Sequence, residues 1–346
     1  MCGVAGETRT NILTRPDRDP KQQEDQVALA RLVPESMSYE LQAAETLGDG
    51  ICRIVCRQIE DAICASKTKR NGKGSPVHET RKHLKKARAA LRLVRGETER
   101  DLWKKEDRCL GKVAQLISQV RDAEVRLQTV RQLREFAWGK KKSFQQTEEF
   151  LAFELDSFLA AFSEWPEEAE DRLGRTLDRI RKWPLSGLRC RCLRRNVQRT
   201  YKRGRDILND VTRKASTRKL HSFRKRAKEL WYQLRLLRPL APDVFKELND
   251  ELKTIGECLG QVHDLAFVAQ RLSSIGPATR PGERGLNALI DSRKQELKRT
   301  AIALGQRFYA ERPREFARRI SRYFSEWETA KARCPAQAGR AMTSLN

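Results

Sequence analysis

The chain repeats one helical segment at an interval of 143 residues, and this repeat constrains the fold more than any other feature of the sequence. The segment VHETRKHLKKARAALRLVR (77–95) aligns without a gap with LHSFRKRAKELWYQLRLLR (220–238). A second pair, ISQVRDAEV (117–125) and LGQVHDLAF (259–267), aligns at an interval of 142 residues. Two aligned pairs at nearly the same interval predict a tandem duplication of about 145 residues.

Apolar residues recur at the i, i+3, i+4, i+7 spacing of amphipathic helices from about residue 38 onward, and strand-like alternation is absent. Short breaks rich in Gly, Pro or Asn separate the helical stretches. The expected helices cover residues 42–68, 76–95, 100–135, 144–180, 186–211, 217–238, 242–272 and 284–329, the last with a break at Pro313. The sequence therefore predicts an all-α protein built from two pseudo-symmetric four-helix bundles.

The domain boundaries follow from the repeat and from the ends of the helical pattern. Residues 39–184 form the first expected bundle and residues 185–330 the second. Residues 1–38 lack sustained periodicity and contain three prolines, so they are expected to be a disordered leader. Residues 331–346 are expected to be a flexible tail.

The net charge of +25 comes from two blocks of the sequence. Residues 66–96 hold 11 basic residues and one acidic residue, and residues 182–238 hold 19 basic and three acidic residues. Charge concentrated in this way predicts a polyanionic partner: nucleic acid, anionic lipid or polyphosphate. No apolar run approaches the roughly 18 residues that a membrane span needs. The chain has nine cysteines, an odd and sparse number, and it lacks an apolar N-terminal segment. Both features favour a reducing compartment, so the cytoplasm is the expected location.

Both copies of the repeated helix carry a cationic face beside an apolar stripe. At about 100° per residue, one face of the first copy holds His78, Arg81, Lys82, Lys85, Arg88 and Arg92, and one face of the second holds His221, Arg224, Lys225, Lys228 and Arg235. The apolar stripes are Leu84, Ala87, Leu91 and Val94 in the first copy, and Phe223, Leu230, Leu234 and Leu237 in the second. The like charges repel by roughly 0.2–0.5 kcal/mol per neighbouring pair. One such helix is typical of a solvated surface, but its repetition, with the histidine, favours an anion that binds both faces.

The expected helix before the second copy adds further cations around Tyr201, namely Arg199, Lys202, Arg203 and Arg205. An Arg side chain can bind two phosphate oxygens at once, and Lys acts as a point charge. Stacking on aromatic side chains supplies much of the affinity for single-stranded nucleic acid, and near the cationic faces the sequence offers only Tyr201 and Tyr232. The surface therefore favours phosphate oxygens over bases.

These motifs together resemble the CHAD family, the conserved histidine α-helical domain. The resemblance rests on the His-x-x-Arg-Lys-x-x-Lys pattern of both repeated helices, on RRNVQRTYKRGRDIL (194–208) and on ALGQRFYAERPREFARRISRYF (303–324). The Arg121-Asp122 and His263-Asp264 pairs, which we expect in turns, also match it. The resemblance covers about residues 39–330 and implies two bundles about a pseudo-two-fold axis. Their basic helices would line a central groove or pore that binds inorganic polyphosphate, and some family members are directed to polyphosphate granules.

Carried over to this chain, the resemblance implies polyphosphate contacts from three helices. They would be His78, Arg81, Lys82, Lys85, Arg88 and Arg92, then Arg199, Lys202, Arg203 and Arg205, then His221, Arg224, Lys225, Lys228 and Arg235. The second copy departs from the first at one position of the ridge, where Trp231 stands opposite Arg88. The two halves are therefore not expected to contribute equally.

The competing functions differ in the chemistry they require. A phosphohydrolase would use His78 or His221, but neither has an orienting carboxylate or a nucleophile in its sequence neighbourhood. Metal ligands at a suitable spacing are also missing, so no catalytic residue, metal or cofactor is predicted. The main alternative is binding of the RNA or DNA backbone, and attachment to a membrane surface ranks last. The favoured prediction is non-enzymatic binding of polyphosphate.

Overall fold

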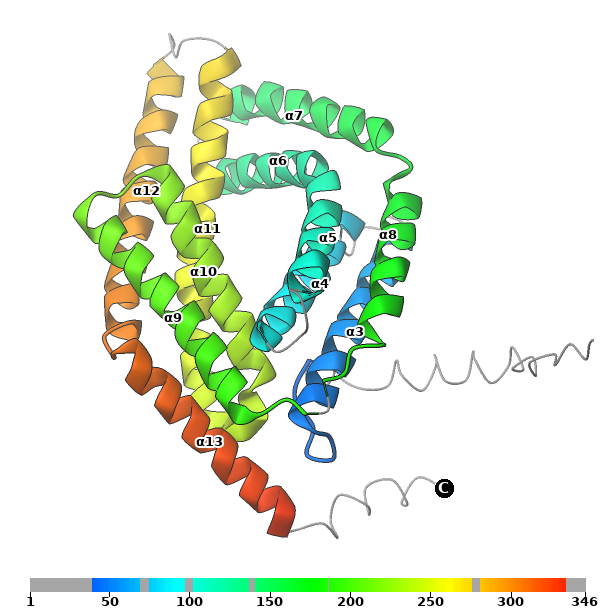
Figure 1. Cartoon of the computed structure of the whole chain (residues 1–346). Coiled ribbons are helices and arrows are strands. Elements are labelled where there is room, and N and C mark those ends of the chain that lie inside the picture. The colour runs from blue at the N-terminus through cyan, green and yellow to red at the C-terminus, as the bar shows by residue number, and fades with distance from the viewer. Residues whose placement is uncertain are drawn as a thin grey trace, which may run out of the picture. The chain divides into compact units, whose positions relative to one another are not determined.

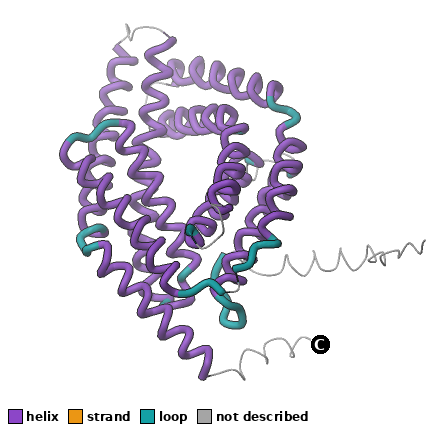
Figure 2. The backbone as a smooth tube through the Cα atoms, viewed as in Figure 1, coloured by secondary structure: helices purple, strands orange, loops and turns teal. Residues whose placement is uncertain are grey.

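The computed structural model describes residues 39–68, 75–96, 102–136, 141–185, 187–275 and 281–333 (Figure 1). These residues form helices and loops with no strand among them, as the sequence predicted (Figure 2). The helices are α3 (Leu47–Lys67), α4 (Pro76–Leu91), η1 (Arg92–Val94), α5 (Leu102–Leu116), α6 (Ser118–Phe136), α7 (Lys141–Ala161), α8 (Trp165–Ile180), α9 (Cys190–Arg213), α10 (Thr217–Leu236), η3 (Arg238–Leu240), α11 (Pro242–Ile275), α12 (Pro281–Phe308) and α13 (Pro313–Arg333). The expected leader, 1–38, and all but the first three residues of the expected tail lie outside the described residues.

The helices of the two halves pack in the same order. In the first half, α3 packs against α4 and α8, α4 against α5, and α6 against α7. In the second half, α9 packs against α10 and α13, α10 against α11, and α11 against α12. Helices of different halves also touch, α4 with α10 and α6 with α11. The division at 184/185, which falls in the loop between α8 and α9, stays a prediction.

Buried apolar side chains hold α4 and α10 in place. The predicted stripes of both helices are at most 1% exposed, which confirms the face that each turns to the core. Serine N-caps start both helices, because Ser75 Oγ accepts from the His78 amide at 3.1 Å and Ser216 Oγ accepts from the Lys219 amide at 3.3 Å. The ridge helices therefore begin at the positions that the sequence predicted, 76 and 217.

Helices α4 and α10 cross at their small and polar residues. Gln233 Nε2 donates to the carbonyl of Ala89 at 3.3 Å, and Arg92 Nη1 lies 3.0 Å from Glu229 Oε2. Both contacts lie at or near the C-terminal ends of α4 and α10, so the two helices meet there (Figure 1). The two cationic faces consequently lead away from one crossing point.

Two of the expected helices are interrupted. The expected helix 100–135 is divided at Ile117 into α5 and α6, whereas the aligned residue Leu259 lies inside the continuous helix α11. The division leaves the last carbonyls of α5 without helical partners, and the carbonyl of Ala114 accepts a hydrogen bond from Arg81. The expected helix 144–180 ends at Ala161 and restarts as α8, where Pro166 occupies the first turn.

The remaining corrections and confirmations concern single positions. Arg121-Asp122 lies inside α6 and His263-Asp264 inside α11, so the expectation of turns there was wrong. The expected break at Pro313 is confirmed, because α12 ends at Phe308 and α13 begins at the proline.

Candidate anion-binding site

Cations from three helices gather around Lys85. The pKa of Lys85 is lowered to about 7. Burial is the largest cause, and the positive charges of Arg81, Arg224, Arg121 and Lys228 also lower it. Of these, Arg81 lies on α4 with Lys85, Arg121 on α6, and the other two on α10. The central cluster is defined as His78, Arg81, Lys85, Arg121, His221, Arg224 and Lys228.

The Lys85 side chain is both reached by solvent and surrounded by protein. It belongs to the exposed residues, and yet desolvation is the largest influence on its pKa. Both observations hold together for an amine that lines a concave, water-accessible surface. Such a surface allows a solvated anion to approach the amine.

Glycines on α11 provide the space for two of the cations. A Cβ atom on Gly256 would come within 2.8 Å of Lys228 Cε, and one on Gly260 within 3.1 Å of Arg224 Nη2. Both side chains therefore lie close against the backbone of α11. On the opposite ridge, Arg81 is held by the carbonyl of Ala114. The cations are thus fixed in place before any ligand binds.

Carboxylates lie at the edge of the central cluster. Arg121 Nη1 bonds to Glu124 Oε2 at 3.2 Å, and the charge of Asp122 acts on Arg81. Lys82 Nζ bonds to Glu79 Oε2 at 2.8 Å. Because each of these carboxylates meets one cation, the cluster keeps a large positive excess.

The ridge histidines are neutral near pH 7. The pKa of His78 is lowered, first by burial and then by the charge of Arg121. The pKa of His221 is lowered to about 4, first by burial and then by the charge of Lys225. The ring of His221 stacks on His263 at a centroid distance of 4.7 Å. Its Nδ1 atom is buried without a hydrogen-bond partner in the described residues. A neutral imidazole can donate one N–H to a phosphate oxygen.

The structure does not leave Arg88 and Arg92 free, although both were predicted ligand contacts. Arg88 Nε lies 2.9 Å from Asp107 Oδ1, and its Nη2 lies 3.3 Å from Oδ2. Arg92 bonds to the same carboxylate at 3.1 Å and also to Glu229 at 3.0 Å. Asp107 lies on α5 and Glu229 on the other ridge helix, α10, so the helical pattern of the first ridge does not reveal these partners.

The cations of α9 are divided among different surroundings. Arg199 and Arg203 line a separate cavity with other arginines, which we call the arginine pocket and define as Arg92, Arg95, Trp103, Arg199, Arg203 and Arg226. Lys202 bonds to Asp206 at 2.6 Å on the exposed surface. Arg205 acts on the hydroxyl of Tyr201, which donates to the carbonyl of Phe308. The structure therefore brings neither Lys202 nor Arg205 into the central cluster.

Aromatic rings hold the cations at the far end of α10. Lys228 Nζ lies 4.2 Å from the centroid of Trp231, and the guanidinium of Arg235 lies 5.2 Å from the same ring. Arg235 also lies 5.9 Å from the ring of Tyr39. Lys225 is exposed at the edge of the cluster. Trp231 thus orients the cations that flank it.

The family of the chain follows from comparison with known proteins. The family model of the CHAD domain matches residues 56–273, more than half of the chain. The chain belongs to the CHAD domain family. No protein in the curated set matches it.

Solved structures show the same CHAD fold. PptA from Streptomyces chartreusis is 13% identical, with a TM-score of 0.53 over 76% of this chain and 99% of PptA. The CHAD domain from the plant Ricinus communis is 14% identical, with a TM-score of 0.51 over 76% of this chain and 94% of that domain. At these identities the likeness concerns the fold.

Sequence reasoning missed several residues of this CHAD site. Arg121 lies in the second repeated segment, whose shared Gln-Val-x-Asp pattern was a signal for it. Arg226 lies on α10 and Arg95 follows η1, both off the common face of their ridge, and both line a pocket with residues of α9. The role of Gly256 and Gly260, which leave space for Lys228 and Arg224, is visible only once α10 and α11 are packed together.

Other kinds of site find little support in the described ranges. Within them, no three His, Cys, Asp or Glu side chains are grouped so as to hold a metal ion. In the same ranges, no helix combines the length and apolar character that crossing a membrane requires.

Proposed function

We propose that this protein binds inorganic polyphosphate through the central cluster and does not cleave it. The observation that carries the proposal is Lys85, a water-accessible amine on which the strongest charges are all positive. A bound polyanion would remove this repulsion. Binding of this kind would also recruit the protein to cytoplasmic polyphosphate granules.

The cluster suits a phosphate chain better than a nucleic acid. Tyr201 is fully buried and Tyr232 is 7% exposed, so the two aromatic residues expected near the ridges are not available for stacking on bases. Trp231 is already occupied by two cations. A linear phosphate polymer offers one charge or more per unit and no base, which matches a surface of Arg, Lys and neutral His.

The surroundings of the histidines support binding without hydrolysis. The nearest carboxylate oxygen to His78 Nε2 is 3.8 Å away, on Glu79, which bonds to Lys82. His221 stacks on His263, and no described carboxylate is bonded to it. A general base needs a group that orients its ring and a nucleophile within reach. No release of orthophosphate is expected, with or without a divalent metal.

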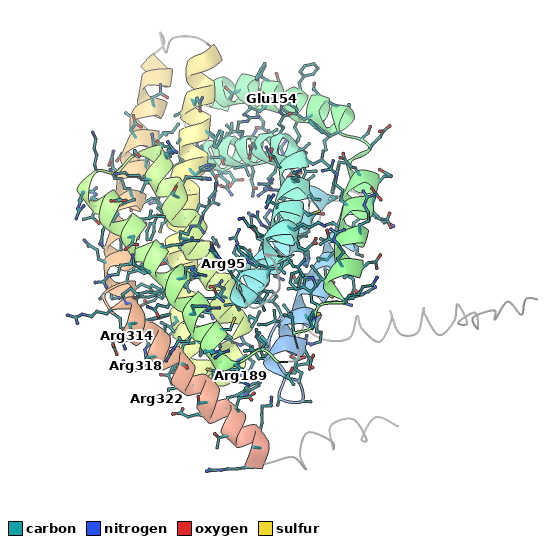
Figure 3. The ribbon with its side chains drawn as sticks, in the orientation of Figure 1. Arg95, Glu154, Arg189, Arg314, Arg318 and Arg322 are labelled. Atoms are coloured by element: carbon teal, nitrogen blue, oxygen red, sulfur yellow. The ribbon has the colours of Figure 1, made fainter. Side chains whose placement is uncertain are left out.

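The test is reversal of charge in the cluster, with Arg81→Glu and Arg224→Glu combined. Affinity for labelled long-chain polyphosphate should fall by at least 100-fold, because two charge-assisted contacts become repulsive. The matched control is Arg314→Glu with Arg322→Glu, which changes the net charge equally on the exposed face of α13 (Figure 3). The control should bind within about threefold of the unmodified protein.

Fluorescence polarisation at two salt concentrations measures the affinity, and far-UV circular dichroism checks that the variants remain helical. Wild-type affinity should fall steeply with salt, since phosphate binding releases counterions. If the reversed protein loses its helicity, Arg81→Gln with Arg224→Gln provides the same test at lower cost to folding. Unchanged affinity in a folded double variant would rule the proposal out. Displacement of polyphosphate by RNA at equal phosphate concentration would instead support the nucleic-acid alternative.

A further inference from the structure

A cavity of about 160 Å³ lies where the end of the first ridge helix meets the second half of the chain. Its walls come from η1, α5, α9 and α10, and Arg95, which follows η1, is labelled in Figure 3. One water molecule needs only about 10–15 Å³ measured in this way. The arginine pocket, defined above, therefore has room for a small ligand.

The charges of the pocket are only partly balanced. Asp107 is bonded to Arg88 and Arg92, and Glu229 to Arg92 and Arg226. These two carboxylates thus serve three arginines. A further three, Arg95, Arg199 and Arg203, form no salt bridge with a carboxylate in the ranges that the structure describes, although the charge of Glu229 acts on Arg203.

Several contacts hold the unbalanced arginines in position. Asn196 Nδ2 donates to the carbonyls of Leu93 and Arg95 at 2.8 and 3.0 Å, and its Oδ1 accepts from Arg199 at 3.0 Å. This one amide ties η1 to α9 and fixes Arg199. Burial has the largest effect in lowering the pKa of the Arg199 guanidinium, and the charge of Arg95 has the next largest, so these arginines repel one another.

A second observation points to an oxyanion as the ligand. Trp103 lines the pocket, is 7% exposed and leaves its indole N–H without an acceptor in the described part of the chain. The guanidinium of Arg95 lies 4.7 Å from the Trp103 ring and so holds it in place. A buried N–H without an acceptor costs free energy. An anionic oxygen would accept from it and would neutralise the arginines beside it.

The aligned corner of the other half is built differently. The buried positions of α3 and α9 match at an interval of 142, which places Arg57 and Asp61 opposite Arg199 and Arg203, and these two residues form an ion pair at 3.1 Å. His83 stands 143 positions before Arg226. Phe245, 142 positions after Trp103, has no N–H. Tyr39 packs beside Arg235, the residue aligned with Arg92, and its hydroxyl donates to the carbonyl of Lys86 at 3.0 Å. The pocket arginines are therefore not a by-product of the repeated basic ridge.

We infer that the arginine pocket is a second anion site, distinct from the central cluster, and that it binds one phosphate-type oxyanion group. The shared chemistry is a tetrahedral group with several charged oxygens, which accepts from Arg95, Arg199, Arg203 and Trp103. Such a group comes from free orthophosphate or from the end of a phosphate chain. The inference holds whether or not the central cluster binds long polyphosphate, because a single phosphate group fulfils it.

Calorimetric titration of the full chain with orthophosphate, and separately with tripolyphosphate, tests the inference. Arg199→Gln should lower the affinity for the ligand by tenfold or more, since it removes a charge-assisted bond. Trp103→Phe should lower the affinity severalfold, because it keeps the ring beside Arg95 but removes the donor. The matched control is Lys202→Gln, which removes one charge from the exposed side of α9 and should change the affinity by less than twofold.

The two ligands distinguish the source of the phosphate group. Orthophosphate binding that depends on Arg199 identifies a free-anion site, and tripolyphosphate binding alone with the same dependence identifies a chain-end site. If Arg199→Gln does not fold, the exposed Arg203→Gln variant replaces it. The inference is overturned if neither ligand binds, or if binding is insensitive to both pocket variants. Failure here is separate from failure of the proposed function, because the pocket variants are measured with short phosphate ligands and the cluster variants with long-chain polyphosphate.

Discussion

The two copies of the basic helix hold their cations in different ways. In the first copy, Arg88 is bonded through two nitrogens to the carboxylate of Asp107. In the second copy, Trp231 stands in the position of Arg88, and Asn249 stands in the position of Asp107. The arginine and its carboxylate are thus both replaced. A carboxylate cancels the charge that it holds, whereas an aromatic ring orients a cation and leaves its charge available, so the halves differ in how much charge they offer an anion.

The strongest test of this comparison is Asp107→Asn, which makes the first half resemble the second. Removing the half of the ion pair that is most buried should lower the free energy of unfolding by about 3 kcal/mol. Asn249→Leu is the matched change in the second half. Both polar atoms of the Asn249 amide are buried without partners among the described residues, so this variant should be neutral or stabilising. Urea unfolding measures both, and equal losses would contradict the comparison.

The cost of Asp107→Asn should also depend on pH. Burial acts to raise the pKa of Asp107, but the hydrogen bond from Arg88 and the charge of Arg92 outweigh it and lower the pKa. A carboxyl whose pKa is lower in the folded state adds stability above its unfolded pKa, and loses this as the pH falls through the folded value. The difference between wild type and variant should therefore be complete at pH 7 and shrink below about pH 4.

The next prediction separates Lys85 from its aligned partner Lys228. The charges that act most on Lys85 are positive, whereas Lys228 has Glu257 nearby and the Trp231 ring. Because the pKa of Lys85 is about 7, the amine is mostly neutral at higher pH. Binding of a polyanion there requires Lys85 to take up a proton from the solvent. Wild-type affinity for polyphosphate should fall about tenfold from pH 6 to pH 8.

Replacement of each lysine in turn distinguishes their roles. Lys85→Gln should bind more weakly and show a nearly flat pH profile, while Lys228→Gln should bind more weakly and keep the slope. Polarisation titrations at several pH values provide the measurement. A slope that survives in Lys85→Gln would mean that another group takes up the proton.

The smallest expected effect concerns Trp231. Trp231→Leu removes the ring that faces Lys228 and Arg235, and should lower the free energy of unfolding by about 1 kcal/mol. Trp231→Phe keeps an aromatic face and should retain most of the stability. Thermal unfolding compares the two variants. If leucine and phenylalanine give the same result, the ring does not hold the cations.

The sequence predicted the fold well where the signal is local. The start of α4 at Pro76 and the break at Pro313 depend on prolines, whose fixed φ angle and missing N–H affect the helix at their own position. The division at Ile117 was missed because nothing in the residues on either side breaks the helical pattern. The reason for it emerges only in the packed structure, where Arg81 uses the carbonyl of Ala114.

The candidate site was predicted in part for the same reason. Helical spacing identifies the residues that share a face, so Lys85 and Arg224 were expected on their ridges. Spacing does not show which carboxylates fold onto that face, and Asp107 removes Arg88 from the available charge. Nor does it show that the charge of Arg205 acts on the hydroxyl of Tyr201.

The meeting of α4 and α10 near their C-terminal ends has a consequence for the direction in which a polymer can bind. Because both ridges carry aligned His, Arg and Lys residues and meet at the same end, a ligand that passes from one ridge to the other meets a similar order of charges from either side. An unbranched phosphate polymer has two identical ends and therefore no direction, whereas an RNA or DNA strand has two different ends. A site of this kind would accept a non-directional chain in two equivalent orientations, which doubles the number of productive encounters without any additional contact.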